Sequence, residues 1–321
     1  MALTINHETN DISNATGTII VNGVAVGADN SPVWYGSRGL FGGGTTGNIV
    51  DTIDYITIDT TGNATDFGDL SRTCAGLGAC SNGTRGVFGG GMSGAGETIQ
   101  DVIEYVIIAN TGNATDFGNL SVGRNFLAGC SNNTRGLFSG GTTGSVSNVI
   151  DYITIASTSN ATDFGNLSVA RNFLGACANE TRGLFAGGST GSNSNVIDYV
   201  TIASTGNATD FGDLSTASIF LAGCSDETRG VFNLGNTGSD SNVIEYVTIA
   251  STGNATDFGD LTTARYSTAS CSNGIRGVFG GGYTGGRVNV IDYITIQTTG
   301  NATDFGDLTS ARNFLAACSG N

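Results

Sequence analysis

The hexapeptide NATDFG occurs six times in this chain, and this repetition limits the possible folds more than any other feature. Successive copies begin 50, 47, 47, 47 and 47 residues apart. Six RG(L/V)F segments recur with them, and three extra residues between Arg85 and Tyr105 account for the one longer interval. A period of this length indicates a solenoid, a propeller or another array of equal units. The hexapeptides begin at Asn63, Asn113, Asn160, Asn207, Asn254 and Asn301.

Each repeat contains four segments with the composition of short β-strands, and a helical period is absent. In the last repeat these segments are residues 314–318, 276–281, 289–296 and 303–308. The third, NVIDYITI, is rich in β-branched and aromatic residues and is bounded by turn-forming residues. It carries apolar side chains on both of its faces, which indicates a strand that is covered on both sides.

Six such four-stranded units predict an all-β fold, a six-bladed β-propeller over residues 32–321. The chain ends in FLAACSGN, which has the pattern of a first strand without a blade of its own. The segment before the first RGLF unit, SPVWYG, matches the other first strands poorly. We therefore expect the C-terminal strand to complete the first blade and to close the ring, which removes open sheet edges.

Residues 1–31 lie outside the repeats and form a second predicted unit. Thr18–Val26 contains two apolar runs around Asn22-Gly23, a sequence typical of a type I′ hairpin. An isolated hairpin is only marginally stable in water, so it must pack on another surface. Two alternatives stay open: the segment packs on its own propeller, or it attaches the propeller to a partner protein.

Composition and charge exclude several functional classes. The chain has 12 arginines, no lysine and 27 carboxylates, for a net charge of −15, so no nucleic-acid partner is expected. His7 is the only histidine and lies outside the repeats, which excludes histidine-dependent triads and multi-histidine metal sites. No apolar run approaches the ~18 residues that span a bilayer, so no membrane insertion is expected. The first residues lack the features of a secretory signal, and we expect synthesis in a cytoplasm, where NAT is not glycosylated.

Six of the seven cysteines recur once per repeat. This spacing argues against disulfides within repeats and predicts a small buried side chain on an inner strand. The alternative is a ring of thiolates around a metal in a central channel, although no histidine or CxxC partner accompanies these cysteines. We expect neither a metal nor a cofactor. The recurring cysteines are Cys80, Cys130, Cys177, Cys224, Cys271 and Cys318.

An acidic residue precedes the tyrosine of every third strand. Because these acids lie within strands, they either pair with arginines or approach a channel, and we favour structural pairing. On another pair of turns, Arg276 and Asp304 start close together and are expected to form a structural ion pair. The alternative there is a cation held by the TDFG aspartates. The strand acids are Asp54, Glu104, Asp151, Asp198, Glu245 and Asp292.

The loops of a propeller lie on two faces. The first face carries the turns between first and second strands and between third and fourth strands. The second face carries the loops between second and third strands and the connections between blades, and here the repeats differ. Two loops of the last blade supply Arg265 and Tyr266, and Tyr283 and Arg287, whose aromatic and guanidinium groups suit a saccharide or an anionic group. Random variation among surface loops is the alternative. The lengthened loop Met92–Asp101 is a second candidate contact region.

The repeat resembles a known family. A hydrophobic strand ending in glycines, a tyrosine strand, and an aromatic residue followed by leucine and arginine are similar to the kelch repeat. Here they read GVFGGG, VIDYITI and DFGDLTSAR, with phenylalanine where kelch repeats usually carry tryptophan. The resemblance covers about residues 33–321 and implies a propeller, but kelch repeats host enzymes, actin binders and adaptors. The GNATDFGDL and NGTRGVFGGG arrays and the opening LTINHETNDISNATGTIIVNG also resemble kelch-like tail-fibre and virion proteins of marine bacteriophages.

The expected function is that of a non-enzymatic bacteriophage structural protein, either a tail fibre or appendage or a capsid-associated protein. Its expected location is the virion, after synthesis in the host cytoplasm. The propeller is expected to bind a host-surface saccharide or a partner virion protein, and residues 1–31 to contact other virion proteins; a homo-oligomer stays open. The alternatives are a carbohydrate-active hydrolase or lyase, which needs an asymmetric acid–base pair, and an intracellular kelch adaptor.

Overall fold

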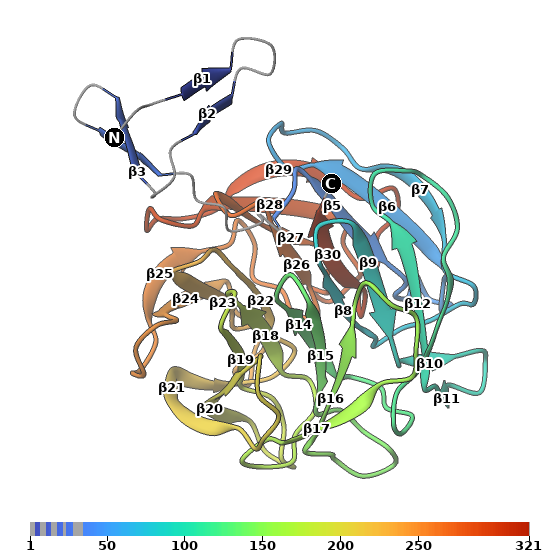
Figure 1. Ribbon diagram of the computed structural model, residues 1–321. Coiled ribbons are helices and arrows are strands. Elements are labelled where there is room, and N and C mark those ends of the chain that lie inside the picture. Colours follow the sequence, from blue (N-terminus) through green and yellow to red (C-terminus); the bar gives the residue numbers. More distant parts are fainter. Residues whose placement is uncertain (1–3, 7–10, 14–17, 22–23, 28–34, 321) are drawn as a thin grey trace. The chain divides into compact units, whose positions relative to one another are not determined.

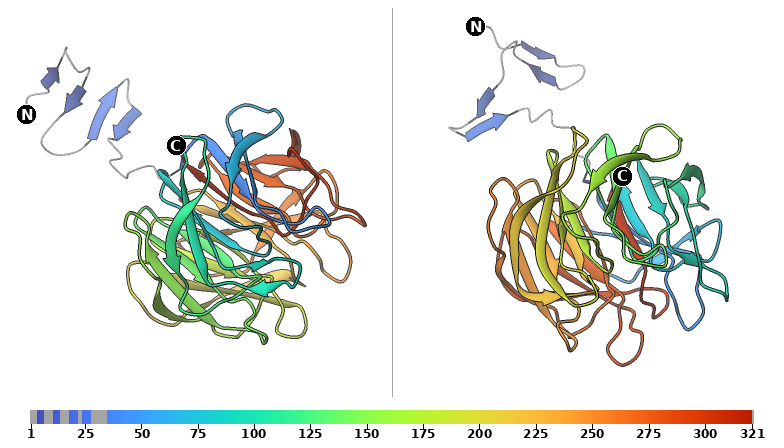
Figure 2. Two further views of the ribbon diagram at one scale, coloured as in Figure 1. Left: turned by 90° about the vertical axis from the view of Figure 1, so that its right-hand side faces the viewer. Right: turned by 90° about the horizontal axis from the view of Figure 1, so that it is seen from below.

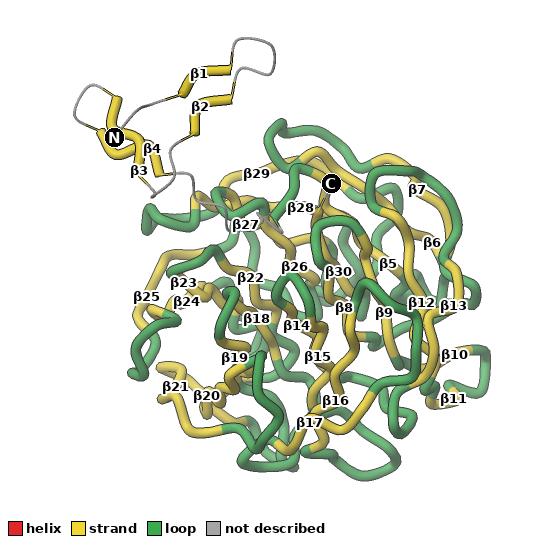
Figure 3. The backbone as a smooth tube through the Cα atoms, viewed as in Figure 1, coloured by secondary structure: helices red, strands yellow, loops and turns green. Residues whose placement is uncertain are grey.

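The computed structural model describes residues 4–6, 11–13, 18–21, 24–27 and 35–320, which form strands and turns (Figures 1 and 3). The chain divides into two compact units, Met1–Val33 and Trp34–Asn321. No helix occurs among the described residues, and so none of them belongs to a helix long and apolar enough to cross a bilayer.

The first unit contains two antiparallel strand pairs, β1 with β2 and β3 with β4. The β3–β4 pairing, with Thr18 opposite Gly27 and Val21 opposite Val24, confirms the expected hairpin. The Asn22-Gly23 turn predicted between these strands lies outside the described residues. The strands are β1 (Thr4–Asn6), β2 (Asp11–Ser13), β3 (Thr18–Val21) and β4 (Val24–Gly27).

The second unit is a β-propeller of six four-stranded antiparallel sheets arranged in a ring, as the repeats predict (Figures 1 and 2). The inner strands line a central channel. We number these blades 1 to 6 around the ring. Blade 2 also has a small hairpin, β10 (Met92–Ser93) with β11 (Thr98–Ile99), in its lengthened loop. From the innermost strand outward, blade 1 consists of β30 (Ala316–Gly320), β5 (Arg38–Gly42), β6 (Thr52–Thr57) and β7 (Thr65–Asp69), and blade 2 of β8 (Gly78–Ser81), β9 (Arg85–Gly89), β12 (Val102–Ile107) and β13 (Thr115–Asn119). In the same order, blade 3 consists of β14 (Ala128–Ser131), β15 (Arg135–Ser139), β16 (Val149–Thr154) and β17 (Thr162–Asn166), and blade 4 of β18 (Gly175–Ala178), β19 (Arg182–Ala186), β20 (Ser194–Thr201) and β21 (Thr209–Ser218). Blade 5 consists of β22 (Ala222–Ser225), β23 (Arg229–Asn233), β24 (Val243–Thr248) and β25 (Thr256–Asp260), and blade 6 of β26 (Ala269–Ser272), β27 (Arg276–Gly280), β28 (Val290–Thr295) and β29 (Thr303–Asp307).

The C-terminal strand completes blade 1. β30 pairs antiparallel with β5, with Ala316 opposite Gly42 and Cys318 opposite Leu40. The strand at one end of the propeller sequence is thus hydrogen-bonded to the strand at the other end, and the inner edge of β5 is covered. This pairing confirms the predicted closure.

The third strand of each blade contributes to the core on both of its faces. In blade 6, Ile291 and Ile294 are buried, and Tyr293 packs edge-on against Phe305 with ring centroids 6.0 Å apart. One core cluster joins Ile291 of blade 6 to Ile58 of blade 1. Apolar side chains therefore fill the space between blades, and each blade is stabilised by its neighbours.

The periodic cysteines also lie between blades. Each thiol faces the glycine of the RG(L/V)F segment in the following blade. A Cβ atom added to Gly39 would lie 2.8 Å from Cys271 Sγ, and one added to Gly86 would lie 2.9 Å from Cys318 Sγ. Both distances are too short for packed side chains, so the joint repetition of cysteine and glycine is a packing requirement.

The arginines of the same segments connect each blade to the next on the first face. The Arg276 guanidinium lies over the Tyr293 ring of its own blade, 4.7 Å from the centroid. Its Nη1 group donates hydrogen bonds to the carbonyl oxygens of Ile58 (3.1 Å) and Asp59 (2.9 Å) in blade 1. The other five arginines lie over their own tyrosines in the same way and donate to the isoleucine carbonyl of the next blade.

The asparagine of NATDFG forms a second ring of contacts between blades. Its Oδ1 atom accepts a hydrogen bond from a backbone N–H of the outermost strand in the preceding blade, at 3.1 Å in all six cases. In blade 1, for example, the Asp69 N–H donates to Asn113 of blade 2. The contacts recur because a closed ring needs one at every junction, so the hexapeptide has a structural role.

Candidate functional site

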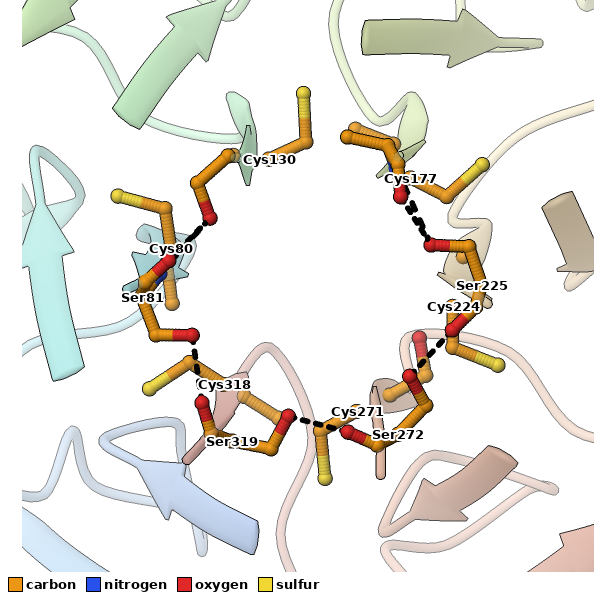
Figure 4. Close-up of a pocket in the computed structure, with 18 of the residues that line it drawn as sticks. Cys80, Ser81, Cys130, Cys177, Cys224, Ser225, Cys271, Ser272, Cys318 and Ser319 are labelled. Carbon is orange, nitrogen blue, oxygen red and sulfur yellow. Dashed lines mark hydrogen bonds between the residues drawn. The ribbon is translucent and has the colours of Figure 1, made fainter. Parts of the chain in front are cut away.

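The two ends of the central channel differ in chemistry. At the first-face end, serine hydroxyls of the inner strands each donate to a backbone carbonyl of the preceding blade, at 2.6–2.7 Å (Figure 4). Ala178 replaces the serine in blade 4, so this series of hydrogen bonds is interrupted once. Tyr35, the first propeller residue that the structure describes, lines this end of the channel. The serines are Ser81, Ser131, Ser225, Ser272 and Ser319.

The thiols beside these serines point away from the channel (Figure 4). Burial raises the pKa of all seven cysteines, to about 11 for Cys74 and about 12 for Cys318. Protonated thiols that face a neighbouring blade are unsuited to binding a metal in the channel. Among the described residues, no group of three or more histidine, cysteine, aspartate or glutamate side chains is placed to hold a metal ion.

Arginines pair with five of the six strand acids, as we favoured. Arg124 Nη2 lies 2.7 Å from Asp151 Oδ2, and both side chains are fully buried. Arg124 Nη1 also donates to the backbone carbonyls of Gly140 and Val149. Burial lowers the pKa of Arg124, and the charge of Asp151 opposes that shift. The other pairs are Arg72–Glu104, Arg171–Asp198, Arg265–Asp292 and Arg312–Asp54, at 2.8–3.0 Å.

Blade 5 lacks this arginine. Ser218 occupies its place in the sequence, and the buried Leu234 stands where each of the other blades has a glycine. Leu234 packs in a cluster with Leu221. The buried Glu245 accepts hydrogen bonds from the backbone N–H and the hydroxyl of Ser215, as Asp151 of blade 3 does from Ser121. The acid of blade 5 thus keeps the serine contacts that other blades have and lacks only the arginine.

Arg265 is not available for binding, and our expectation for it was wrong. Its side chain is fully buried, with Nη1 2.8 Å from Asp292 Oδ2, and its Nε donates to the Gly281 carbonyl at 3.0 Å. It takes the same structural role as Arg171 and Arg312. The adjacent Tyr266 is bridged to Tyr283, and its side chain is partly exposed while that of Arg265 is buried.

The expected ion pair between Arg276 and Asp304 does not form either. Arg276 lies over Tyr293 and donates to carbonyl groups of blade 1, as described above. Asp304 is exposed on β29, where it lies opposite Asp292. Neither residue belongs to any of the five ion pairs within the described part of the chain. The tyrosine ring and the backbone carbonyls take the place that we had assigned to the aspartate.

At the second-face end of the channel, the connection into each blade contributes one residue to a closed ring of backbone hydrogen bonds. The N–H of each residue donates to the carbonyl of its equivalent in the preceding blade, at 2.6–3.4 Å. Four of the six are phenylalanines with φ of 54–60°, a region that bulky residues rarely adopt. Strained positions of this kind concentrate at functional sites. The six residues are Gly76, Phe126, Phe173, Phe220, Ser267 and Phe314.

The phenylalanine rings gather at this mouth and two tyrosine rings continue outward from them, and we call these six side chains the aromatic strip. Neighbouring phenylalanine centroids lie 4.3–5.8 Å apart, and the rings line a hollow of about 70 Å³. Phe220 lies 5.2 Å from Tyr266, which lies 5.5 Å from Tyr283. All six rings are partly exposed, so they form a surface and not a core. The strip consists of Phe126, Phe173, Phe220, Phe314, Tyr266 and Tyr283.

The structure brings together three of the four residues expected to bind a ligand. Tyr266 and Tyr283 exchange backbone hydrogen bonds of 3.2 and 2.9 Å, and Tyr283 is bridged to Arg287, whose side chain is exposed. Burial, and then the negative charge of Asp240 in blade 5, raise the pKa of Tyr266. In the five other blades the pair equivalent to Tyr266–Tyr283 contains no aromatic residue: Asn313–Thr45, Ala75–Met92, Asn125–Thr142, Asn172–Ser189 and Ile219–Asn236.

The lengthened loop of blade 2 forms the β10–β11 hairpin. Glu97 is exposed at its turn with a φ of 50°. Met92 is buried, and its Sδ atom lies 3.6 Å from Asn125 Nδ2. A contact region on this hairpin stays a prediction.

Sequence reasoning missed the phenylalanines and Asp240. The phenylalanines recur in the connections, but we placed Phe314 inside the first strand, whereas the structure begins β30 at Ala316. The left-handed conformation that turns these rings toward the channel mouth has no signature in a single sequence. Asp240 lies in the blade 5 loop and approaches Tyr266 only because blades 5 and 6 are adjacent.

Comparison with known proteins gave no match to any protein-family model and none to any curated protein. The fold therefore rests on the structure, and the kelch resemblance rests on the repeat residues alone.

Proposed function

We propose that this chain is a non-enzymatic structural protein of a bacteriophage particle, and that its propeller binds a host-surface saccharide or a partner virion protein through the second face. The aromatic strip is the observation that carries this proposal. It is a partly exposed row of six rings on the face where the blades differ. Partly exposed aromatic surfaces of this kind are typical of recognition sites.

One further observation bears on the roles of the two faces. Tyr35, the first propeller residue that the structure describes, lines the first-face end of the channel, whereas the aromatic strip lies at the second-face end. Residues 1–31, which precede Tyr35 in the sequence, are the proposed attachment to other virion proteins.

The acids of the blades support a binding role over a catalytic one. The hydrolase or lyase alternative requires two carboxylates in different environments beside one substrate. Five of the strand acids are held by arginines and the sixth by Ser215. Because each strand acid is bound by another residue of the propeller, these acids are better suited to a structural role than to catalysis.

The test is to look for the chain in purified phage particles and to measure its binding to cells of the host bacterium. We expect the full chain to be a component of the particle and to bind host cells. The double variant Tyr266→Asn and Tyr283→Thr should remain folded and lose this binding. A chain that is abundant in infected cells but missing from purified particles would contradict the proposed role.

A further inference from the structure

Charged groups on the second face gather at one end of the aromatic strip. In five of the loops between second and third strands, the residue at the start is bridged to a residue four positions later. That later residue is apolar in blades 1 and 3, an amide in blade 4, and charged in blades 5 and 6. Tyr266 and Tyr283 lie in this charged sector. The later residues are, in blade order, Ile49, Val146, Asn193, Asp240 and Arg287.

Asp240 is placed to accept hydrogen bonds from a ligand on the tyrosine rings. Its side chain is half-buried, and Asn236 Nδ2 approaches its Oδ1 at 3.5 Å. Its Oδ2 has no hydrogen-bond partner within the part of the chain that the structure describes. Asn236 is also bridged to Ile219, the residue before Phe220, and the Phe220 ring lies 5.2 Å from Tyr266, so the loop that carries Asp240 borders the tyrosine pair. The sector thus combines aromatic faces, one carboxylate acceptor and, at Arg287, one guanidinium donor.

We infer that this sector binds a neutral saccharide, with one pyranose ring against Tyr266 and Tyr283 and neighbouring hydroxyls donating to Asp240. This inference rests on the proposed function and specifies the ligand of the same face. The C–H groups on one side of a pyranose carry partial positive charge, and the face of an aromatic ring is negative. A carboxylate accepts hydrogen bonds from two hydroxyls at once, and such charge-assisted bonds are the stronger kind.

Charge decides between a neutral and an anionic sugar. A carboxylate or sulfate on the ligand would face Asp240 and a chain whose net charge is −15. Arg287 is the one arginine in the loops between second and third strands, and Asp240 supplies one opposite charge to the same sector, so the two charges sum to zero. Like charges at a recognition site disfavour a partner, so sialylated and uronate-containing glycans are expected to bind less well.

The same geometry fixes the number of ligands per propeller. The strip ends in a tyrosine pair in the single sector between blades 5 and 6, whereas the five equivalent pairs in the described chain lack aromatic rings. A sixfold scaffold is therefore expected to bind one saccharide and not six.

The experiment uses the full chain and a printed array that carries neutral hexose oligosaccharides beside the same structures capped with sialic or uronic acid. The best neutral binder is then titrated calorimetrically. We expect binding to neutral glycans, with a stoichiometry of one. Asp240→Asn should lower the affinity by about tenfold or more, since it replaces a charged acceptor by a neutral amide. Asn193 holds the equivalent position in blade 4, so the fold accommodates an asparagine there. Val146→Ala, at the equivalent position of blade 3, is the matched control and should leave affinity unchanged.

Four results would overturn the inference: no neutral glycan bound, an acidic glycan preferred, a stoichiometry above one, or an affinity unchanged in Asp240→Asn. Binding of a peptide or protein in place of glycans belongs to the first of these. The proposed function fails separately. The full chain could bind host cells and lose this binding in the double variant Tyr266→Asn and Tyr283→Thr, yet bind no neutral glycan on the array. That combination would leave the proposed function in place and remove this inference. A thermal unfolding midpoint equal to that of the unmodified chain shows that each variant is folded.

Discussion

The first and second faces of the propeller are built from the same six repeats, yet they use repetition in opposite ways. On the first face, every blade has the same arginine over the same tyrosine and the same NATDFG asparagine, which accepts a hydrogen bond from the preceding blade. Both sets of contacts continue around the whole ring. On the second face, the residues that recur are the buried arginine–acid pairs, whereas the loops that cover these pairs differ from blade to blade. Repetition of these arginines, asparagines and buried pairs marks positions that hold the ring together, and departure from the repeat at Tyr266 and Tyr283 marks positions free to recognise a ligand.

The connections between blades show how near these two classes of residue lie. Arg265 and Tyr266 are neighbours, but one is a buried anchor shared with other blades and the other is a partly exposed ring that no other blade has at this position. A residue's place on a variable face is thus a poor guide to its role. Its recurrence in the other blades is a better one.

The strongest test of this comparison is to remove an anchor beneath the second face. Arg171→Ala leaves Asp198 buried without its partner, and we expect a loss of about 3–5 kcal/mol in the free energy of unfolding. Chemical denaturation measures it. Arg287→Ala, on the exposed surface of the same face, is the control and should change stability by no more than about 0.5 kcal/mol. Equal effects of the two substitutions would break the distinction between anchor and surface.

A smaller effect is expected from the asparagine of the hexapeptide on the first face. Asn160→Ala removes the acceptor for the Asn119 N–H, and we expect a loss of about 1 kcal/mol, the usual net contribution of one hydrogen bond. Asn160→Asp keeps an acceptor oxygen and should retain most of this stability. Calorimetric unfolding midpoints compare the two variants. If alanine and aspartate behaved alike, the structural role of this residue would lose its support.

The smallest effect on stability is expected from the two tyrosines of the aromatic strip. Tyr266→Asn with Tyr283→Thr introduces the residues that blade 3 carries at Asn125 and Thr142, so stability should stay within about 0.5 kcal/mol. Denaturant midpoints of the double variant and the unmodified chain provide the measurement. A loss of several kcal/mol would show that these tyrosines belong to the core and would remove the contrast between the faces.

The sequence was sufficient to predict the fold because the repeat is long, regular and strongly β-forming. The six blades, the strand positions and the closure by the C-terminal strand were all predicted from local patterns. The site was predicted less well. Recurrence of arginine at Arg124, Arg171 and Arg312 was a signal that Arg265 is structural, and we did not apply it. The meeting of Asp240 with Tyr266 depends on the contact between two blades, which no single loop sequence reports.

The pairing of β30 with β5 also has a consequence for biosynthesis. The last strand of the propeller has to emerge from the ribosome before the ring can close, so the nascent chain carries β5 without its inner partner while all the other blades are synthesised. Six nearly identical inner strands compete for that edge, and exchange of strands between repeats or between chains is the characteristic failure of such arrays. Correct closure therefore depends on the few positions where the blades differ, which gives those differences a second use besides recognition.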